Sequence, residues 1–110
     1  MWLTSYIIKA NEQNAVRGNV TYSNSDCVNV EGASPYNGMK TVAPYGIKYN
    51  PAYGETGVVI PTETGNMLLG VTSFDEDLEQ GELKLFSKGG AEILLKNNGK
   101  VYINGTEVIL

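Results

Sequence analysis

The chain has 110 residues, 42% of them hydrophobic, so it can bury one core but is too short for a multi-domain enzyme. Its net charge of −4 gives no long-range attraction for phosphate backbones, which excludes nucleic acid as the expected partner. It has no histidine, the usual general base and commonest transition-metal ligand, so we expect no catalytic, cofactor-binding or metal site and no enzyme activity.

The N-terminal part of the sequence predicts short strands separated by turns. Frequent glycines and short runs of Val, Ile and Leu favour an all-β fold. Alternating apolar residues predict strands over 3–9, 15–22 and 27–31. Gly18 lies inside the second of these and predicts a bulge or bend there.

The segment 32–57 is rich in Gly, Pro, Tyr and Asn, and only 39–42 within it resembles a strand. Loops of this length in small domains tend to be functional or to pack on a neighbour. Its tyrosines either cap the open end of a barrel or form a binding surface. These candidate surface-binding residues are Tyr36, Tyr45, Tyr49 and Tyr53.

The middle of the chain predicts a hairpin followed by an acidic connection. Two apolar runs, 57–61 and 66–73, are joined by TETG, in which Gly65 can take a positive φ. The carboxylates of Asp75, Glu76 and Asp77 lack the spacing of an EF-hand loop, and neighbouring carboxylates on one loop do not flank a cleft as a glycosidase pair does. We therefore interpret this stretch as a solvated connection.

Residues 81–110 predict a meander of short strands with Gly-containing turns. Apolar residues alternate with polar ones such as Lys84, Lys96 and Tyr102. A meander this short has little core of its own, so its apolar face must lie against the preceding domain or against identical segments of other chains. The expected oligomer-interface residues are Leu83, Leu85, Ile93, Leu95, Val101 and Ile103.

Residues 45–96 resemble the phage baseplate spike family of the Mu type, also called baseplate assembly protein V. The resemblance rests on the order of a YG segment, a GVVI strand, a second apolar strand before an acidic stretch, and the runs LEQGELKLF (78–86) and GGAEILLKNNG (89–99). It implies a small OB-like β-barrel followed by a β-stranded stem that trimerises. The barrel strands would be the first three predicted strands together with 58–60 and 67–72.

Spikes of this family usually continue into a longer stem and a pointed tip that can hold a metal through histidines. This chain has no histidine and stops at Leu110. We therefore expect no metal-capped tip, and either a short stem or a point supplied by another protein.

Together these features predict a barrel domain over 1–80 and an oligomerisation stem over 81–110. The expected protein is a homotrimeric structural component of a contractile-tail baseplate, made in the bacterial cytoplasm, with other baseplate or tail proteins as partners.

The longest apolar run, 67–71, is far shorter than the about 20 residues of a membrane-spanning helix, so no stable membrane insertion is expected. Cys27 is the one cysteine and has no intramolecular disulfide partner. The alternative is a monomeric β-barrel that binds a carbohydrate or peptide.

Overall fold

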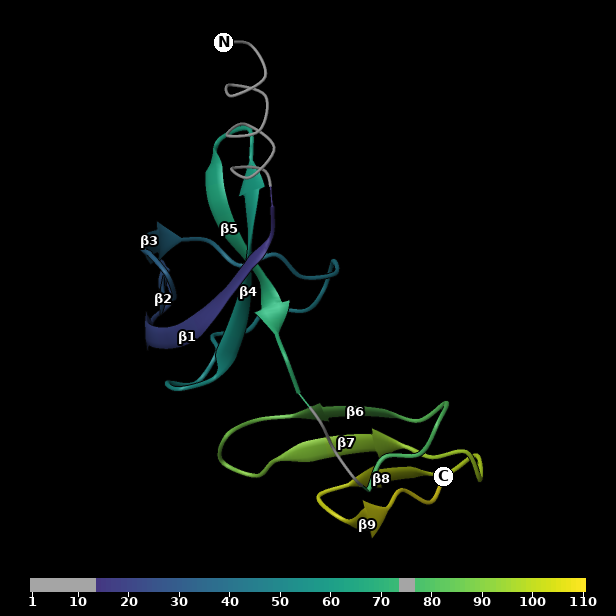
Figure 1. Ribbon diagram of the computed structural model, residues 1–110. Helices are drawn as coiled ribbons and strands as arrows, with labels where there is room; N and C mark the ends of the chain where they lie inside the picture. The colour runs from purple at the N-terminus through teal and green to yellow at the C-terminus, as the bar shows by residue number, and fades with distance from the viewer. Residues whose placement is uncertain (1–13, 74–76) are drawn as a thin grey trace, which may run out of the picture. The chain divides into compact units, whose positions relative to one another are not determined.

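The computed structural model describes residues 14–73 and 77–110 (Figure 1). Over these residues the protein is all-β, with nine strands in two antiparallel sheets, and the predicted fold class is confirmed. The chain divides into two compact units, Met1–Thr72 and Ser73–Leu110, and each unit holds one sheet. The strand predicted over 3–9 lies outside the described residues.

The first unit is a five-stranded sheet in the order β3-β2-β1-β4-β5. Three consecutive strands pair as neighbours, and the fourth returns by a long connection to lie beside the first, which is the Greek-key arrangement. The strands are β1 (Val16–Ser23), β2 (Val28–Glu31), β3 (Pro35–Met39), β4 (Thr56–Thr62) and β5 (Gly65–Val71).

The two edge strands of this sheet are linked to each other. After β3 the chain continues to Thr41, which forms a parallel bridge with Leu68 of β5. The Val42 amide donates to the Leu68 carbonyl at 2.8 Å, and the Leu68 amide donates to the Lys40 carbonyl at 2.9 Å. The sheet therefore curls until its edges meet, and its strand order matches that of five-stranded Greek-key barrels of the OB type.

The core of the first unit lies inside this curled sheet, and every strand contributes to it. Val28 and Val30 are buried while Asn29 and Glu31, on the other phase of β2, are not. Burial on alternate residues is what a strand with one face on a core requires. The six buried hydrophobic side chains are Val20, Val28, Val30, Met39, Val59 and Leu68.

The predicted hairpin is confirmed, because β4 and β5 pair antiparallel up to Thr62 and Gly65, where Gly65 has a φ of 127°. The irregularity predicted in the second strand lies elsewhere. Gly18 keeps a regular register with β4, and the bulge falls between Val20 and Tyr22. Gly18 is needed for close approach instead, because a Cβ there would lie 2.7 Å from the Glu31 carbonyl oxygen.

The strand predicted over 39–42 is wrong. The strand is Pro35–Met39, and residue Thr41 makes only an isolated bridge. Gly38 has a φ of 69° at the point where the β2–β3 register shifts, so the apolar alternation is interrupted there. Pro35 begins the strand, a position where its missing N–H is tolerated.

The second unit is an antiparallel meander in the order β6-β7-β8-β9, as the sequence predicts for this region (Figure 1). Its tight turns use positive φ angles at Gly90, Gly99 and the pair Asn104 and Gly105. None of the described residues from 77 onward is buried, so the meander has no core of its own. The strands are β6 (Leu83–Phe86), β7 (Glu92–Leu95), β8 (Val101–Ile103) and β9 (Thr106–Glu107).

Candidate functional site

The antiparallel register of the meander brings the six predicted interface residues onto one face. Two rows run across β6, β7 and β8. Side chains directly opposite each other on neighbouring strands have Cβ atoms about 4.5–5.5 Å apart, so each row is continuous. One row is Leu83, Leu95 and Val101, and the other is Leu85, Ile93 and Ile103. We call these six residues the apolar face.

The apolar face is open to solvent. Five of its side chains are exposed, from 41% for Leu95 to 53% for Leu83, and Val101 is half-buried. Complete burial of a Leu or Ile side chain contributes about 1.5–3 kcal/mol. Since these side chains are already about half covered, completing their burial would add on the order of 1 kcal/mol each. A sheet normally obtains this energy from a second layer.

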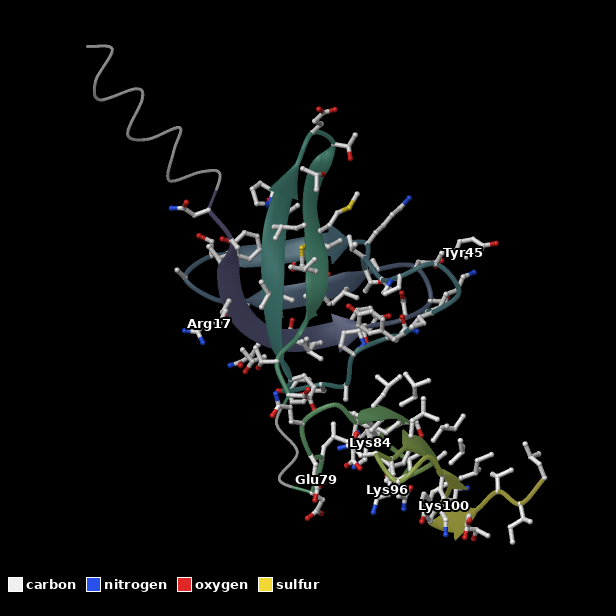
Figure 2. All side chains as sticks on the ribbon, turned by 90° about the vertical axis from the view of Figure 1, so that its right-hand side faces the viewer. Arg17, Tyr45, Glu79, Lys84, Lys96 and Lys100 are labelled. Carbon is white, nitrogen blue, oxygen red and sulfur yellow. The ribbon has the colours of Figure 1, made fainter. Side chains whose placement is uncertain are left out.

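The opposite face of the same sheet carries an ion pair and a cation–π contact beside two apolar side chains, Leu94 and Phe86. Lys84 Nζ lies 3.6 Å from Glu92 Oε2, and Lys96 Nζ lies 5.4 Å from the centre of the Tyr102 ring. Figure 2 shows the labelled lysines along one side of the meander, with carbon-only side chains along the other. The Lys84 and Glu92 side chains are 20% and 32% exposed, so this ion pair is partly covered by its neighbours.

A carboxylate braces the turn before β6 against the turn after β7. Glu82 accepts hydrogen bonds from the backbone amides of Asn97 at 2.9 Å and Glu79 at 3.1 Å. The Asn97 side chain donates in return to the Gln80 carbonyl at 2.9 Å. These amides, that of Asn97 foremost, lower the pKa of Glu82 because they stabilise its charged form.

The four predicted surface tyrosines have different environments. Tyr36 packs against the core of the first unit, whereas Tyr45 and Tyr53 are 107% and 78% exposed. Tyr45 points away from the sheet (Figure 2). Tyr49 is half-buried, its buried hydroxyl has no hydrogen-bond partner among the described residues, and burial raises its pKa. The four rings therefore do not form one exposed aromatic surface.

Two hollows in the first unit have no counterpart in the sequence predictions. One, of about 320 Å³, includes Cys27, Asp26 and Lys40 among its lining residues. The other, of about 290 Å³, lies beside Tyr53 and Glu31. Each joins residues from separate strands and loops, so no local sequence pattern indicates it.

The described residues contain no group of three or more His, Cys, Asp or Glu side chains placed to hold a metal ion. They also form no helix of the length and apolar character needed to cross a membrane. No model of a known protein family matches the sequence, and no curated protein matches it.

Proposed function

We propose that the protein is a structural component that assembles as a homotrimer through the apolar face. It serves as the central spike or hub of a phage or phage-like contractile-tail baseplate. The observation that carries this proposal is the amphipathic meander, which has two rows of exposed Leu, Ile and Val on one face and paired charges on the other.

Identical copies are the occupant that this face fits best. Closed symmetry brings the same residues of each chain together, so one amphipathic sequence supplies both sides of the contact. A face of Leu, Ile and Val with no charged member matches a copy of itself without leaving a buried charge unpaired. Symmetric burial therefore supplies the layer that the meander lacks.

The number three and the baseplate setting come from the resemblance of residues 45–96 to Mu-type spikes. Burial of the apolar face alone requires self-association but does not set the number of copies. In this arrangement the first unit, which has its own core, is a folded body attached to a rigid stem. The role is mechanical, and other baseplate or tail proteins are its further partners.

The alternative, a monomeric barrel that grips a carbohydrate or peptide with four tyrosines, has less support. Its residues would have to act together, yet Tyr36 packs on the core while Tyr45 is fully exposed. Tyr53 is also exposed, so it can contact a ligand without the other three tyrosines.

Light scattering after size-exclusion chromatography at micromolar concentration tests the assembly. We expect a mass three times that of the 11.9 kDa chain. Ile93→Lys should dissociate or unfold the stem, because an unpaired buried charge costs several kcal/mol. Phe86→Lys is the matched control, since Phe86 is 67% exposed and lies on the opposite face, paired with Glu92.

The control variant should keep the wild-type mass. A wild-type monomer whose meander remains stably folded at micromolar concentration would contradict the proposal. So would equal masses for Ile93→Lys and the wild type.

A further inference from the structure

We propose that the first unit carries a separate carbohydrate-binding site, in which the Tyr53 ring and the Asn19 and Glu31 side chains hold one unit of a neutral glycan. The site is the hollow of about 290 Å³ lined by Asn19, Val20, Thr21, Glu31, Tyr53 and Gly54, which we call the Tyr53 hollow. It is independent of the apolar face, since every lining residue belongs to the first unit.

Backbone geometry builds the Tyr53 hollow. The register of β1 shifts between Val20 and Tyr22, so Thr21 is not directly paired with any residue of β2. Such bulges redirect side chains and are common beside binding sites. The Val20 amide donates to the Glu55 carbonyl at 2.8 Å, and the Gly54 amide donates to the Val20 carbonyl at 2.9 Å. These bonds fix the loop that carries Tyr53 against the bulged strand.

The polar groups of the hollow are adjacent and available. Asn19 and Glu31 are directly paired across β1 and β2. Among the described residues neither side chain has a hydrogen-bond or ion-pair partner. Thr21 donates a long hydrogen bond of 3.3 Å to the Asn29 carbonyl, so its hydroxyl oxygen can still accept. An amide, a carboxylate and a hydroxyl therefore surround one exposed ring.

This combination suits a sugar. The apolar C–H face of a pyranose stacks on an aromatic ring, and the 78% exposure of Tyr53 leaves its ring open to such contact. The Asn19 amide both donates and accepts, while the Glu31 carboxylate only accepts, so together they match vicinal hydroxyl groups. The volume is just below the range of about 300–1,000 Å³ for small-molecule sites, which fits one sugar unit of a longer chain.

A cationic ligand fits this hollow less well. Recognition of a quaternary or basic group uses a cage of several aromatic rings, and Tyr53 is the one aromatic residue in the lining. Arg17 lies two residues before Asn19 on the same strand and projects outward (Figure 2), which adds positive charge near the hollow. The negative carboxylate of Glu31 opposes an anionic glycan, so a neutral one is favoured.

Titration of the isotopically labelled full chain, followed by NMR, tests the site. Maltohexaose, cellohexaose and chitohexaose are added separately to about 10 mM, well above the Kd of about 1 mM that a shallow site would give. At least one should shift the backbone amides of Asn19, Thr21 and Gly54 saturably. No saturable shift with any of the three, or shifts confined to other residues, overturns the proposal.

Variants locate the contact. Tyr53→Ala should weaken binding about tenfold, whereas Tyr53→Phe should retain most of it because the ring remains. Tyr45→Ala is the control, since Tyr45 is also an exposed tyrosine but lies outside the hollow, and it should bind as the wild type does. Equal binding of the sugar by Tyr53→Ala and Tyr45→Ala overturns the proposal. So does a result in which hexalysine shifts these amides and none of the three sugars does. Ile93→Lys should bind the sugar normally, which separates this test from that of the trimer.

Discussion

Both units are antiparallel sheets with similar apolar residues, but only the first buries them. The first has strands of up to eight residues, joins its edges at Thr41 and Leu68, and buries six hydrophobic side chains. The second has strands of two to four residues in an open meander, and none of its described residues from 77 onward is buried. The first unit thus covers its apolar side chains within its own sheet, whereas the second leaves its apolar face open, and the proposed assembly would cover that face.

This comparison predicts that a Leu→Ala substitution lowers stability in the first unit and weakens self-association in the second. Leu68 is fully buried, so Leu68→Ala should lower the free energy of unfolding of the first unit by about 2–5 kcal/mol, measured by urea denaturation. Its neighbour Leu69 is 49% exposed, and Leu69→Ala should change stability by about 0.5 kcal/mol or less. Equal losses for the two variants would contradict the described core. Leu95→Ala should instead weaken self-association and leave the first unit unchanged.

A smaller effect is expected where a core side chain packs directly onto a glycine of the first unit. Gly57 is buried, and a Cβ there would lie 2.7 Å from Leu68 Cδ1. Because that methyl group is the end of a flexible side chain, Gly57→Ala should cost about 1–3 kcal/mol of unfolding free energy rather than prevent folding. Gly70→Ala is the control, since its nearest neighbour, the Tyr49 hydroxyl, lies at 3.9 Å. A neutral Gly57→Ala variant would mean that the core is looser than described.

The alternation that forms the apolar face was predicted from the sequence because the strands of the meander keep a period of two. The hairpin of β4 and β5 was predicted from two apolar runs and the TETG turn, although its register shifts between Val58 and Val59. β3 was missed because the positive φ at Gly38 interrupts the period. The Tyr53 hollow was also missed, since it joins a bulge at Thr21 to a loop distant in sequence. Its one local signal was the tyrosine at position 53 in a Gly-rich segment.

The smallest effect concerns the brace at Glu82, which gives the coreless unit a pH dependence. Hydrogen bonds to its carboxylate lower the folded-state pKa below the ordinary value of 4.5. Its stabilising contribution is therefore fully present above pH 4.5 and is lost as the pH falls through the lowered pKa. Following the Asn97 amide by NMR from about pH 6 to pH 3 should show its hydrogen bond weakening over that acidic range.

Glu82→Gln separates this brace from general acid effects. The amide oxygen of Gln does not titrate near this pH, so the Asn97 signal should lose its acidic transition while the turn remains folded. Glu79→Gln, which changes a neighbouring carboxylate that does not accept from Asn97, should keep the transition. If the transition persists in Glu82→Gln, another carboxylate causes it. Its loss in Glu82→Gln, with the transition kept in Glu79→Gln, would assign the acidic transition to the carboxylate that joins the two turns of the meander.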